Sequence, residues 1–191
     1  GTAYSAMRKL EVRAGDSVAI FGLGPVGLSG VAVAKAMGGR VIGVDIVEER
    51  VQLASQMGAD AAVNAGEEDP VEAIQAFTGG KGAGLAFEAS GSAGGRENIV
   101  ACLGYGGKAV FSGAGNSDPV INPGLLIHKQ LTLMGSFVLP LWIAWELVDF
   151  LVDRKLSFEQ AVTHRFPIEE APEAYRVFDG GRTGKVIFEW D

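Results

Sequence analysis

Short runs rich in apolar and β-branched residues alternate along the chain with longer segments in which apolar residues recur at helical spacing. Runs of the first kind favour buried strands, and segments of the second kind favour helices. The pattern predicts six strands, at Ser17–Phe21, Arg40–Asp45, Ala61–Asn64, Gly84–Ala89, Lys108–Ser112 and Gln130–Ser136. It predicts helices at Val26–Met37, Val47–Met57, Pro70–Phe77, near Arg96–Leu103 and at Leu141–Asp153.

This order of strands and helices predicts how the domains are organised. Strand–helix alternation through two halves is typical of a parallel sheet with helices on both faces. We therefore predict an α/β fold with a doubly wound six-stranded parallel sheet (a Rossmann fold) over residues 16–155, after a leading helix and linker at 1–15. Residues 156–191 break the alternation and predict a C-terminal α/β appendage, with elements at His164–Phe166, Ile168–Phe178 and Lys185–Trp190. The start at Gly1, without a methionine, suggests a fragment.

Composition narrows the partners and compartments that we expect. The 191 residues carry 16 basic and 23 acidic side chains, a net charge of −7, which disfavours nucleic acid as a partner. The longest apolar stretch, Phe137–Trp145, is too short to cross a bilayer, so no membrane association is expected. A single cysteine, Cys102, excludes an internal disulfide and a zinc site of several cysteines. We expect a cytoplasmic protein.

The most informative segment is a glycine-rich turn between the first strand and the helix after it. Gly22 permits the tight turn, Gly24 lets a pyrophosphate approach the backbone, and Gly27 lets the helix pack closely on the strand. Pro25 suits the first helical position, and the amide of Val26 is the first expected phosphate donor. Because a strand precedes the turn and a helix follows it, we predict dinucleotide binding here.

An acidic residue follows at the position that such a site requires. Asp45 ends the second strand, where a carboxylate accepts hydrogen bonds from the adenosine ribose hydroxyls and repels a 2′-phosphate. This favours NAD over NADP. Asp45 also suits a helix N-cap, and the two roles are compatible. Arg50 is placed either beside the adenine or as a solvated surface charge, and the sequence favours neither interpretation.

Other strand ends are small or glycine-rich, as a cofactor lying across the edge of a sheet requires. Ligands of these sheets bind beyond the carboxyl ends of the strands. The candidate residues are Ala89, Ser90, Ser112, Gly113, Gly135 and Ser136. Glycine at these positions is also ordinary in loops.

Metal-binding and catalytic patterns are not found. Cys102 lies in a predicted helix and is expected to fill the core. His128 and His164 have no second ligand at metal spacing and are expected to be surface or packing residues. We therefore assign no catalytic residue and no metal ligand to this chain. Trp142 and Trp145, with Leu141 and Val148, are expected in the core rather than at an interface.

Sequence blocks along the whole chain carry a family resemblance. They are GTAYSAM, AGDSVAIFGLGPVG, VIGVDIVEERVQLASQMGAD, FEASG, GGKAVFSG, LTLMGSF and HRFPIEEAPEAYRVFDGGRTGKVIFEW. With them the chain resembles the cofactor-binding half of the zinc-type medium-chain alcohol dehydrogenases, which include polyol and threonine dehydrogenases. The resemblance implies hydride transfer between an alcohol or polyol and NAD, with zinc held by a catalytic domain that is missing here. It also implies that the final segment packs on that domain, with Lys185 near the cofactor phosphates.

The same resemblance implies a homodimer or tetramer that forms through the sheet edge near residues 120–136. Leu131–Gly135 is the predicted outermost strand, and Val120–Asn122 is predicted to form a further short edge. An exposed apolar edge must be covered, which independently favours self-association.

Three other functions stay open at this point. A zinc-independent quinone or enoyl reductase would share the fold, although such relatives usually prefer NADP and lack an acid at the position of Asp45. A non-catalytic dinucleotide-sensing module would use the same residues. A methyltransferase that binds S-adenosylmethionine also has a glycine-rich turn and an acid after the second strand, but it requires no pyrophosphate contact. As it stands, the chain is expected to be inactive in hydride transfer.

Overall fold

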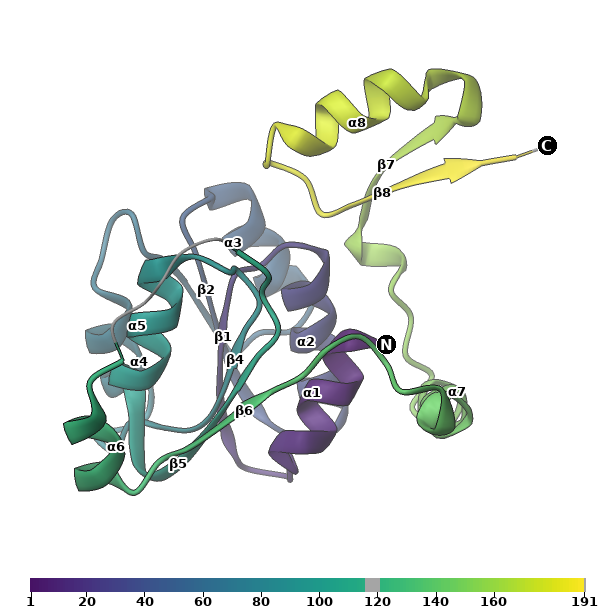
Figure 1. Ribbon diagram of the computed structural model, residues 1–191. Coiled ribbons are helices and arrows are strands. Elements are labelled where there is room, and N and C mark those ends of the chain that lie inside the picture. Colours follow the sequence, from purple (N-terminus) through teal and green to yellow (C-terminus); the bar gives the residue numbers. More distant parts are fainter. Residues whose placement is uncertain (116–120, 191) are drawn as a thin grey trace.

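A sheet of six parallel strands forms the centre of the molecule (Figure 1). The computed structural model describes residues 1–115 and 121–190. Its strands follow the spatial order β3-β2-β1-β4-β5-β6, so the two halves of the sheet meet between β1 and β4. They are β1 (Ser17–Phe21), β2 (Arg40–Asp45), β3 (Ala61–Asn64), β4 (Ala83–Glu88), β5 (Leu103–Phe111) and β6 (Thr132–Gly135). The predicted doubly wound α/β fold is confirmed.

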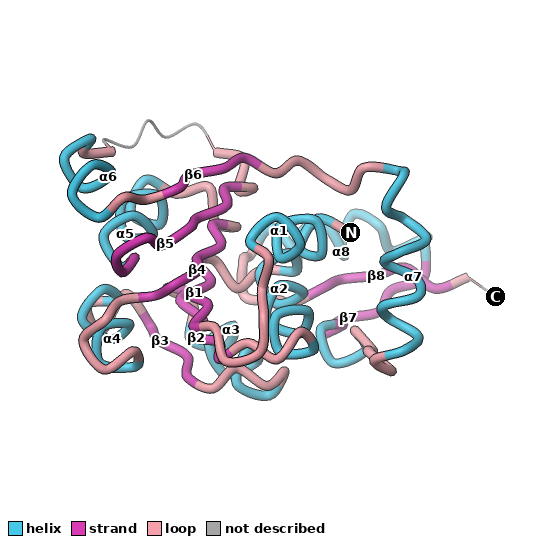
Figure 2. The backbone as a smooth tube through the Cα atoms, turned by 90° about the horizontal axis from the view of Figure 1, so that it is seen from below, coloured by secondary structure: helices cyan, strands magenta, loops and turns pink. Residues whose placement is uncertain are grey.

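Helices cover both faces of the sheet, because alternate residues of each strand are apolar on both sides (Figure 2). Val18 and Ile20 of β1 pack with one set of helices, whereas Ala19 and Phe21 pack with the other. The first face carries α1 (Thr2–Leu10), α2 (Pro25–Ala36), α3 (Glu48–Gln56) and α7 (Ala144–Asp153), and the second carries α4 (Pro70–Phe77), α5 (Ala93–Cys102) and α6 (Pro123–Lys129).

Several boundaries in the second half differ from the sequence-based expectation, and those of α5 and β5 have a clear local cause. Helix α5 begins at Ala93 rather than Arg96, because the Ser92 hydroxyl caps it by accepting a hydrogen bond from the Gly95 N–H at 3.0 Å. Strand β5 begins at Leu103 rather than Lys108, and its register against β4 shifts between Ala83 and Leu85. Glycines at 104, 106 and 107 give this part of β5 the composition of a turn.

The segment before β6 was predicted wrongly as an irregular loop with a short edge strand. Helix α6 occupies residues 123–129, and Ile121 and Asn122 belong to no strand; Val120 lies outside the described residues. The Asn122 side chain caps α6 by accepting a hydrogen bond from the Gly124 N–H at 2.8 Å, and Pro123 opens the helix. Beyond it, β6 is the outermost strand on its side of the sheet, as predicted for Leu131–Gly135.

The C-terminal segment forms a separate two-stranded sheet that stands apart from the six-stranded domain (Figure 1). Strand β8 (Lys185–Glu189) pairs in parallel with β7 (Val162–Pro167), and α8 (Ala171–Asp179) connects them. This pairing supplies the partner that the sequence pattern did not indicate for the last strand. Short 3₁₀ turns complete the chain at η1 (Leu141–Ile143), η2 (Glu159–Ala161) and η3 (Ile168–Glu170).

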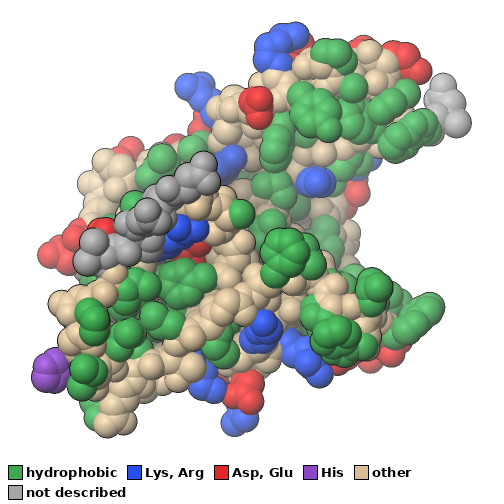
Figure 3. All heavy atoms as spheres, viewed as in Figure 1, with side chains coloured by type: hydrophobic (Ala, Val, Ile, Leu, Met, Phe, Trp, Pro, Cys, Tyr) green, Lys and Arg blue, Asp and Glu red, His purple; other side chains and the backbone are tan. Residues whose placement is uncertain are grey.

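The η1 turn and helix α7 contradict the expectation that Trp142 and Trp145 fill the core. Trp142 is 84% exposed and Trp145 is 79% exposed, and Leu141 and Val148 are exposed as well. The helix instead packs through Leu147 and Phe150 against the cluster that contains α1. Since α7 has one neighbouring layer only, apolar residues on its opposite side remain at the surface, and Figure 3 shows hydrophobic side chains gathered there.

No helix in the described part of the chain is long and apolar enough to span a membrane.

Candidate functional site

A cavity of about 450 Å³ lies where the strand order reverses, at the carboxyl ends of β1, β2 and β4. This is the position at which doubly wound sheets bind ligands, because the connections diverge there to opposite faces. The lining residues come from four connections, and we call this cavity the crevice. They are Phe21, Gly22, Gly24, Val44, Asp45, Ile46, Arg50, Ala65, Ala89, Ser90, Ser92, Gly94, Gly95 and Asn98.

The turn between β1 and α2 has the close backbone packing that its glycines predict. Gly22 has a φ of +85°, in the left-handed region that favours glycine. A Cβ on Gly27 would lie 1.7 Å from the Gly22 carbonyl oxygen, so only glycine fits there. Gly24 is the N-cap residue of α2, and Pro25 occupies the start of the helix. The first hydrogen bond of α2 runs from the Leu28 N–H to the Gly24 oxygen, so the amides of Val26 and Gly27 precede the helical ladder.

Asp45 ties the end of β2 to this turn. Its Oδ2 accepts a hydrogen bond from the Leu23 N–H at 2.6 Å, and its Oδ1 accepts from the amides of Ile46 and Val47 at 2.8 and 3.0 Å. The side chain is 5% exposed. The N-cap residue of α3 is Val47, so Asp45 bonds to amides before the helix and is not itself the cap. A carboxylate has about four lone-pair sites, so roughly one remains after these three bonds.

Arg50 lies between the crevice and the C-terminal segment. Its Nη1 is 3.8 Å from Asp45 Oδ2, and its Nε donates a hydrogen bond to the Thr183 carbonyl oxygen at 3.3 Å. Thr183 lies in the C-terminal segment, just before β8. Arg50 is therefore held by Asp45 on one side and by the C-terminal segment on the other, and it is not a freely solvated charge. It therefore places a cation at the rim of the crevice.

The loop between β4 and α5 brings in residues that the sequence prediction missed. Ala89 and Ser90 were predicted and line the crevice, but Ser92, Gly94, Gly95 and Asn98 line it as well. The sequence did hold a signal for these residues, because Ser92 is a favourable N-cap residue and predicts a helix that begins at Ala93. Such a helix presents its first turns, and with them Asn98, to the crevice. Ile46 and Ala65 had no comparable sequence signal.

Several predicted residues lie outside the crevice. Pro25, Val26, Gly27, Ser112, Gly113, Gly135, Ser136 and Lys185 are not among its lining residues. Ser112 Oγ donates a hydrogen bond to the Ser136 carbonyl oxygen at 2.7 Å, and the Ser136 hydroxyl lies 3.3 Å from that of Ser5 in α1. The ends of β5 and β6 are therefore tied to each other and to α1.

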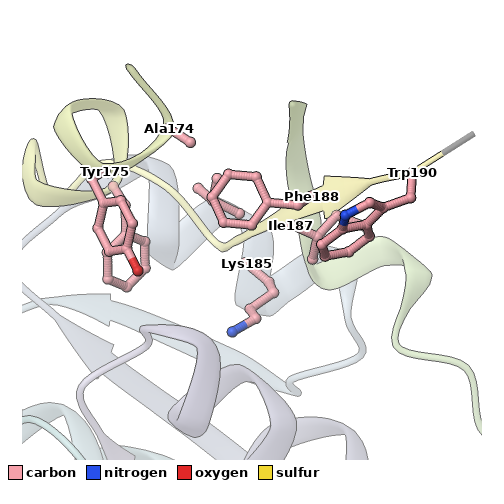
Figure 4. A pocket seen from close by; sticks show the side chains of 8 residues that line it. Ala174, Tyr175, Lys185, Ile187, Phe188 and Trp190 are labelled. Atoms are coloured by element: carbon pink, nitrogen blue, oxygen red, sulfur yellow. The ribbon is translucent and has the colours of Figure 1, made fainter. Parts of the chain in front are cut away.

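Lys185 lines a second cavity, of about 440 Å³, on the appendage. Its apolar walls include Tyr175, Phe188 and Trp190, and we call it the appendage groove. Figure 4 shows the Lys185 side chain extending out of the appendage on the side that faces the six-stranded domain.

The fold and the crevice together define the class of protein. It is a doubly wound α/β domain whose cavity lies where the strand order reverses. The family model described as "Zinc-binding dehydrogenase" matches residues 25–152, more than half of the chain. The chain therefore belongs to the zinc-binding dehydrogenase family.

Individual relatives agree with this assignment. The chain is 35% identical over 192 residues to the uncharacterized zinc-type alcohol dehydrogenase-like protein YphC of Escherichia coli (strain K12), covering 100% of this chain and 54% of that protein. It is 34% identical over 177 residues to L-threonine 3-dehydrogenase of Bacillus subtilis (strain 168), covering 91% and 51%. A solved structure of an NAD-dependent alcohol dehydrogenase superposes with a TM-score of 0.86 at 28% identity, covering 100% and 56%. The chain thus spans about half the length of the relatives it matches.

The described residues do not fit the zinc ion that the family name implies. Among residues 1–115 and 121–190, no three His, Cys, Asp or Glu side chains are grouped to hold a metal. His128 and His164 are exposed and lie on different elements, as expected for surface residues. Cys102 is buried in the core, as predicted, and burial raises the pKa of its thiol to about 12. A thiol with so high a pKa is a poor metal ligand at neutral pH.

Proposed function

We propose that this chain is the NAD(H)-binding part of an alcohol or polyol dehydrogenase. The observation that carries the proposal is the crevice, in which a glycine turn, a helix N-terminus and a buried carboxylate meet at the switch point of the sheet. The match to an NAD-dependent alcohol dehydrogenase structure over the whole chain supports it. Each of these parts suits one part of a dinucleotide.

The pyrophosphate is proposed to lie against the start of α2. Gly22 and Gly24 present backbone without side chains, and the amides of Val26 and Gly27 are free of the helical ladder. Pro25 has no N–H to offer but fixes the backbone of the first turn. The helix dipole adds a partial positive charge at this end. Arg50 lies close by, since a Cβ on Gly24 would be 4.0 Å from its Nη1.

The adenosine ribose is proposed to bind at Asp45. By lone-pair count, the carboxylate has room for about one further strong hydrogen bond, and a ribose hydroxyl supplies that donor. A 2′-phosphate would place negative charge beside a buried carboxylate, which favours NAD over NADP. Arg50 would partly offset this repulsion from its position 3.8 Å from Asp45 Oδ2.

The remaining predicted residues are proposed to contact the nicotinamide side of the cofactor. Ala89 and Ser90 line the crevice itself. Ser112, Gly113, Gly135 and Ser136 lie at the ends of the next strands, and a cofactor extended across the sheet edge would reach them. Lys185, on the side of the appendage that faces this domain, would approach the phosphates.

NADH titration of the chain, followed by its fluorescence, tests the cofactor assignment. We expect micromolar-range binding of NADH. We expect Asp45→Ala to weaken NADH binding by about tenfold, because a hydrogen bond to a charged group is lost. The same change should ease NADPH binding, because the carboxylate no longer repels the 2′-phosphate. Asp45→Asn removes the charge and keeps one acceptor oxygen, which can hold either the Leu23 amide or the amides of Ile46 and Val47. Asp153→Ala, at an exposed position of α7, is the control. Equal affinity of the unmodified chain for NADH and NADPH would contradict the role of Asp45.

Hydride transfer by the whole protein is a proposal that rests on the family. The half of the relatives that this chain does not match would supply the zinc ion, which polarises the alcohol or carbonyl oxygen, and all catalytic residues. This chain would bind and orient the nicotinamide cofactor. With NAD and a panel of alcohols, we expect the 191-residue chain to produce no NADH and to carry no zinc. One zinc per chain by elemental analysis would contradict this division of roles.

The domain boundaries and the appendage fit the same proposal. Residues 16–155 would form the cofactor-binding domain, preceded by the leading segment at 1–15. Residues 156–191 would pack through the appendage groove on the catalytic half of the longer protein. The groove is apolar, and Trp190 and Tyr175 in it are 71% and 65% exposed. Exposed apolar area of this kind marks an interaction site.

We also infer a homodimer or tetramer that forms through the open edge of β6, in the region of residues 120–136. Strand β6 has no strand on its outer side, where the Gly135 oxygen accepts a hydrogen bond from Lys9 Nζ at 2.7 Å, and exposed Phe137 and Ile127 flank it. A cytoplasmic location is proposed from the single buried, unpaired cysteine. No role with nucleic acid or membranes is proposed, because the net charge is −7.

A further inference from the structure

A buried carboxylate lies directly beneath the crevice. Glu88 is the last residue of β4 and is 0% exposed. Its Oε1 accepts three hydrogen bonds, from the N–H groups of Ser90 and Gly91 at 2.8 Å each and from the Ser90 hydroxyl at 2.5 Å. Its Oε2 is buried and has no hydrogen-bond partner among the described residues. Burying an acidic group with one unpaired oxygen costs free energy, so its presence requires an explanation.

The position of this carboxylate explains how closely the connections that follow β1, β4 and β5 approach one another. A Cβ on Gly113, after β5, would lie 2.5 Å from Glu88 Oε2, and a Cβ on Gly95, in the first turn of α5, would lie 3.2 Å from Oε1. The loop that Oε1 holds then lies against the glycine-rich turn, since a Cβ on Gly22 would lie 2.6 Å from the Ser90 nitrogen. Glu88 therefore fixes Ser90 between itself and Gly22.

We propose that Glu88 is a positioning residue that presets the shape of the crevice for its dinucleotide. It acts through Ser90 and Gly91 and does not touch the cofactor, because its oxygens are buried under the loop. Ser90 is exposed, so its hydroxyl would bond to water if the carboxylate were absent. An internal acceptor instead holds the loop in one conformation, which lowers the ordering cost of binding. The inference rests on the proposed binding of NAD(H).

Replacement of the acceptor tests this proposal. Glu88→Leu keeps a side chain of similar size and removes the acceptor, and Glu88→Gln keeps one carbonyl oxygen that can receive the same bonds. Glu97→Leu, at an exposed position of α5, is the matched control. For each chain, the dissociation constant of NADH and the amide hydrogen exchange of Ser90 and Gly91 without NADH would be measured.

We expect Glu88→Leu to weaken NADH binding on the order of tenfold, because the loop must be ordered at the moment of binding. Exchange at the Ser90 and Gly91 amides rises, while amides in β1 and β2 exchange as in the unmodified chain. Glu88→Gln rescues binding to within about threefold, since a neutral acceptor is weaker than a charged one. The control keeps the affinity of the unmodified chain.

Two results would overturn the inference while leaving the proposed function intact. One is unchanged NADH affinity in Glu88→Leu, and the other is weakened binding with no change in exchange at Ser90 and Gly91. Absence of NADH binding by the unmodified chain would instead overturn the proposed function. Should Glu88→Leu fail to fold, Glu88→Met takes its place, because methionine is unbranched like glutamate and its thioether is only a weak acceptor. The same loss of NADH affinity with faster exchange at Ser90 and Gly91 in Glu88→Met supports the inference, and unchanged affinity overturns it.

Discussion

At the residue scale, the glycines of this chain differ in what they do. Gly27 is required by a contact, since its missing Cβ would lie 1.7 Å from a backbone oxygen that cannot move without opening the β1–α2 turn. Gly94 has open space where its Cβ would be, although it too lies in a helix that begins at the crevice. The same residue type therefore has opposite energetic consequences at these two positions.

Alanine at each position should show this difference. We expect Gly27→Ala to lower the free energy of unfolding by about 2 kcal/mol, as overpacking does. Gly94→Ala should raise it by up to about 1 kcal/mol, because alanine is the better helix former. Urea denaturation of the two variants beside the unmodified chain measures both values. Similar destabilisation by both changes would mean that the turn relaxes more easily than its contact suggests.

Residues of the crevice were predictable from sequence where backbone geometry requires a residue type. Gly22, Gly24 and Asp45 follow from the strand–turn–helix pattern and line the crevice. Asn98 and Ala65 line it as well, but no local rule requires their residue types, so only their spatial neighbours reveal them. The Ser136 hydroxyl lies against Ser5 of α1, a contact between residues far apart in the sequence.

At the element scale, one carboxylate adds hydrogen bonds to the apolar packing that attaches α7 to α1. Glu146 Oε1 accepts hydrogen bonds from the Tyr4 hydroxyl at 2.7 Å and from Arg8 Nε at 2.8 Å, and Phe150 lies beside the Tyr4 ring. These hydrogen bonds hold the pKa of Glu146 below its ordinary value. Burial, with the bond to Glu146, raises the pKa of Tyr4 to about 12, so the phenol stays protonated as a donor.

The contact between α1 and α7 should therefore weaken in acid. A carboxyl group whose pKa is lowered on folding contributes its full stabilisation above its unfolded pKa of about 4.3, and the contribution is lost as pH falls through the folded value. We expect the free energy of unfolding of Glu146→Gln to depend less on pH between about pH 5 and pH 3 than that of the unmodified chain. The difference should be less than about 1 kcal/mol, because the site is half exposed. Urea denaturation at several pH values measures it.

Asp149→Asn is the control for this experiment. Asp149 is exposed on the same helix and has no ion pair with any residue in the described ranges. Equal pH dependence in Glu146→Gln and in the unmodified chain would show that Glu146 does not respond to acid as its contacts indicate.

Whole elements were predictable from sequence where the periodicity of apolar residues is strong. They were missed where glycine or proline dominates the local composition. The first three strands match their predicted bounds, since apolar runs there end in clear turns. Helix α6 was missed because Pro123 and Gly124 give its first turn the composition of a loop, although Asn122 and Pro123 also form a good helix start. The early part of β5 was missed because its glycines weaken the strand signal, and only pairing with β4 makes it a strand.

At the scale of the whole molecule, the described residues leave apolar regions and outer strands at the surface. The appendage groove and the outer side of η1 and α7 are apolar regions (Figure 3). Strands β3 and β6 are the two outer strands of the six-stranded sheet, and β6 is the one proposed to associate. The Ser136 N–H donates to the Phe111 oxygen of β5 at 2.9 Å, and N–H directions alternate along a strand. The Gly135 N–H therefore points to the open edge.

Sedimentation velocity should show that the chain is a dimer or larger, because unpaired edges and apolar surface are both covered on association. We expect Gly135→Pro, which removes one outward N–H and blocks pairing without breaking a bond to β5, to shift the chain toward monomer. Trp142→Ser, which removes apolar area from the η1 turn before α7 and leaves β6 unchanged, should keep the association. A monomeric unmodified chain would contradict the proposed interface.

The sequence by itself determined the doubly wound fold, the glycine turn with its acid, and the position of the crevice among the connections. These follow from local rules, because strand and helix periods, φ angles and close backbone approach constrain residue types directly. Only the tertiary structure decided that Trp142 and Trp145 are exposed, that Arg50 bridges to Thr183, and that Glu88 lies beneath the crevice. These depend on which distant segments meet, and the residues near a given position do not specify that.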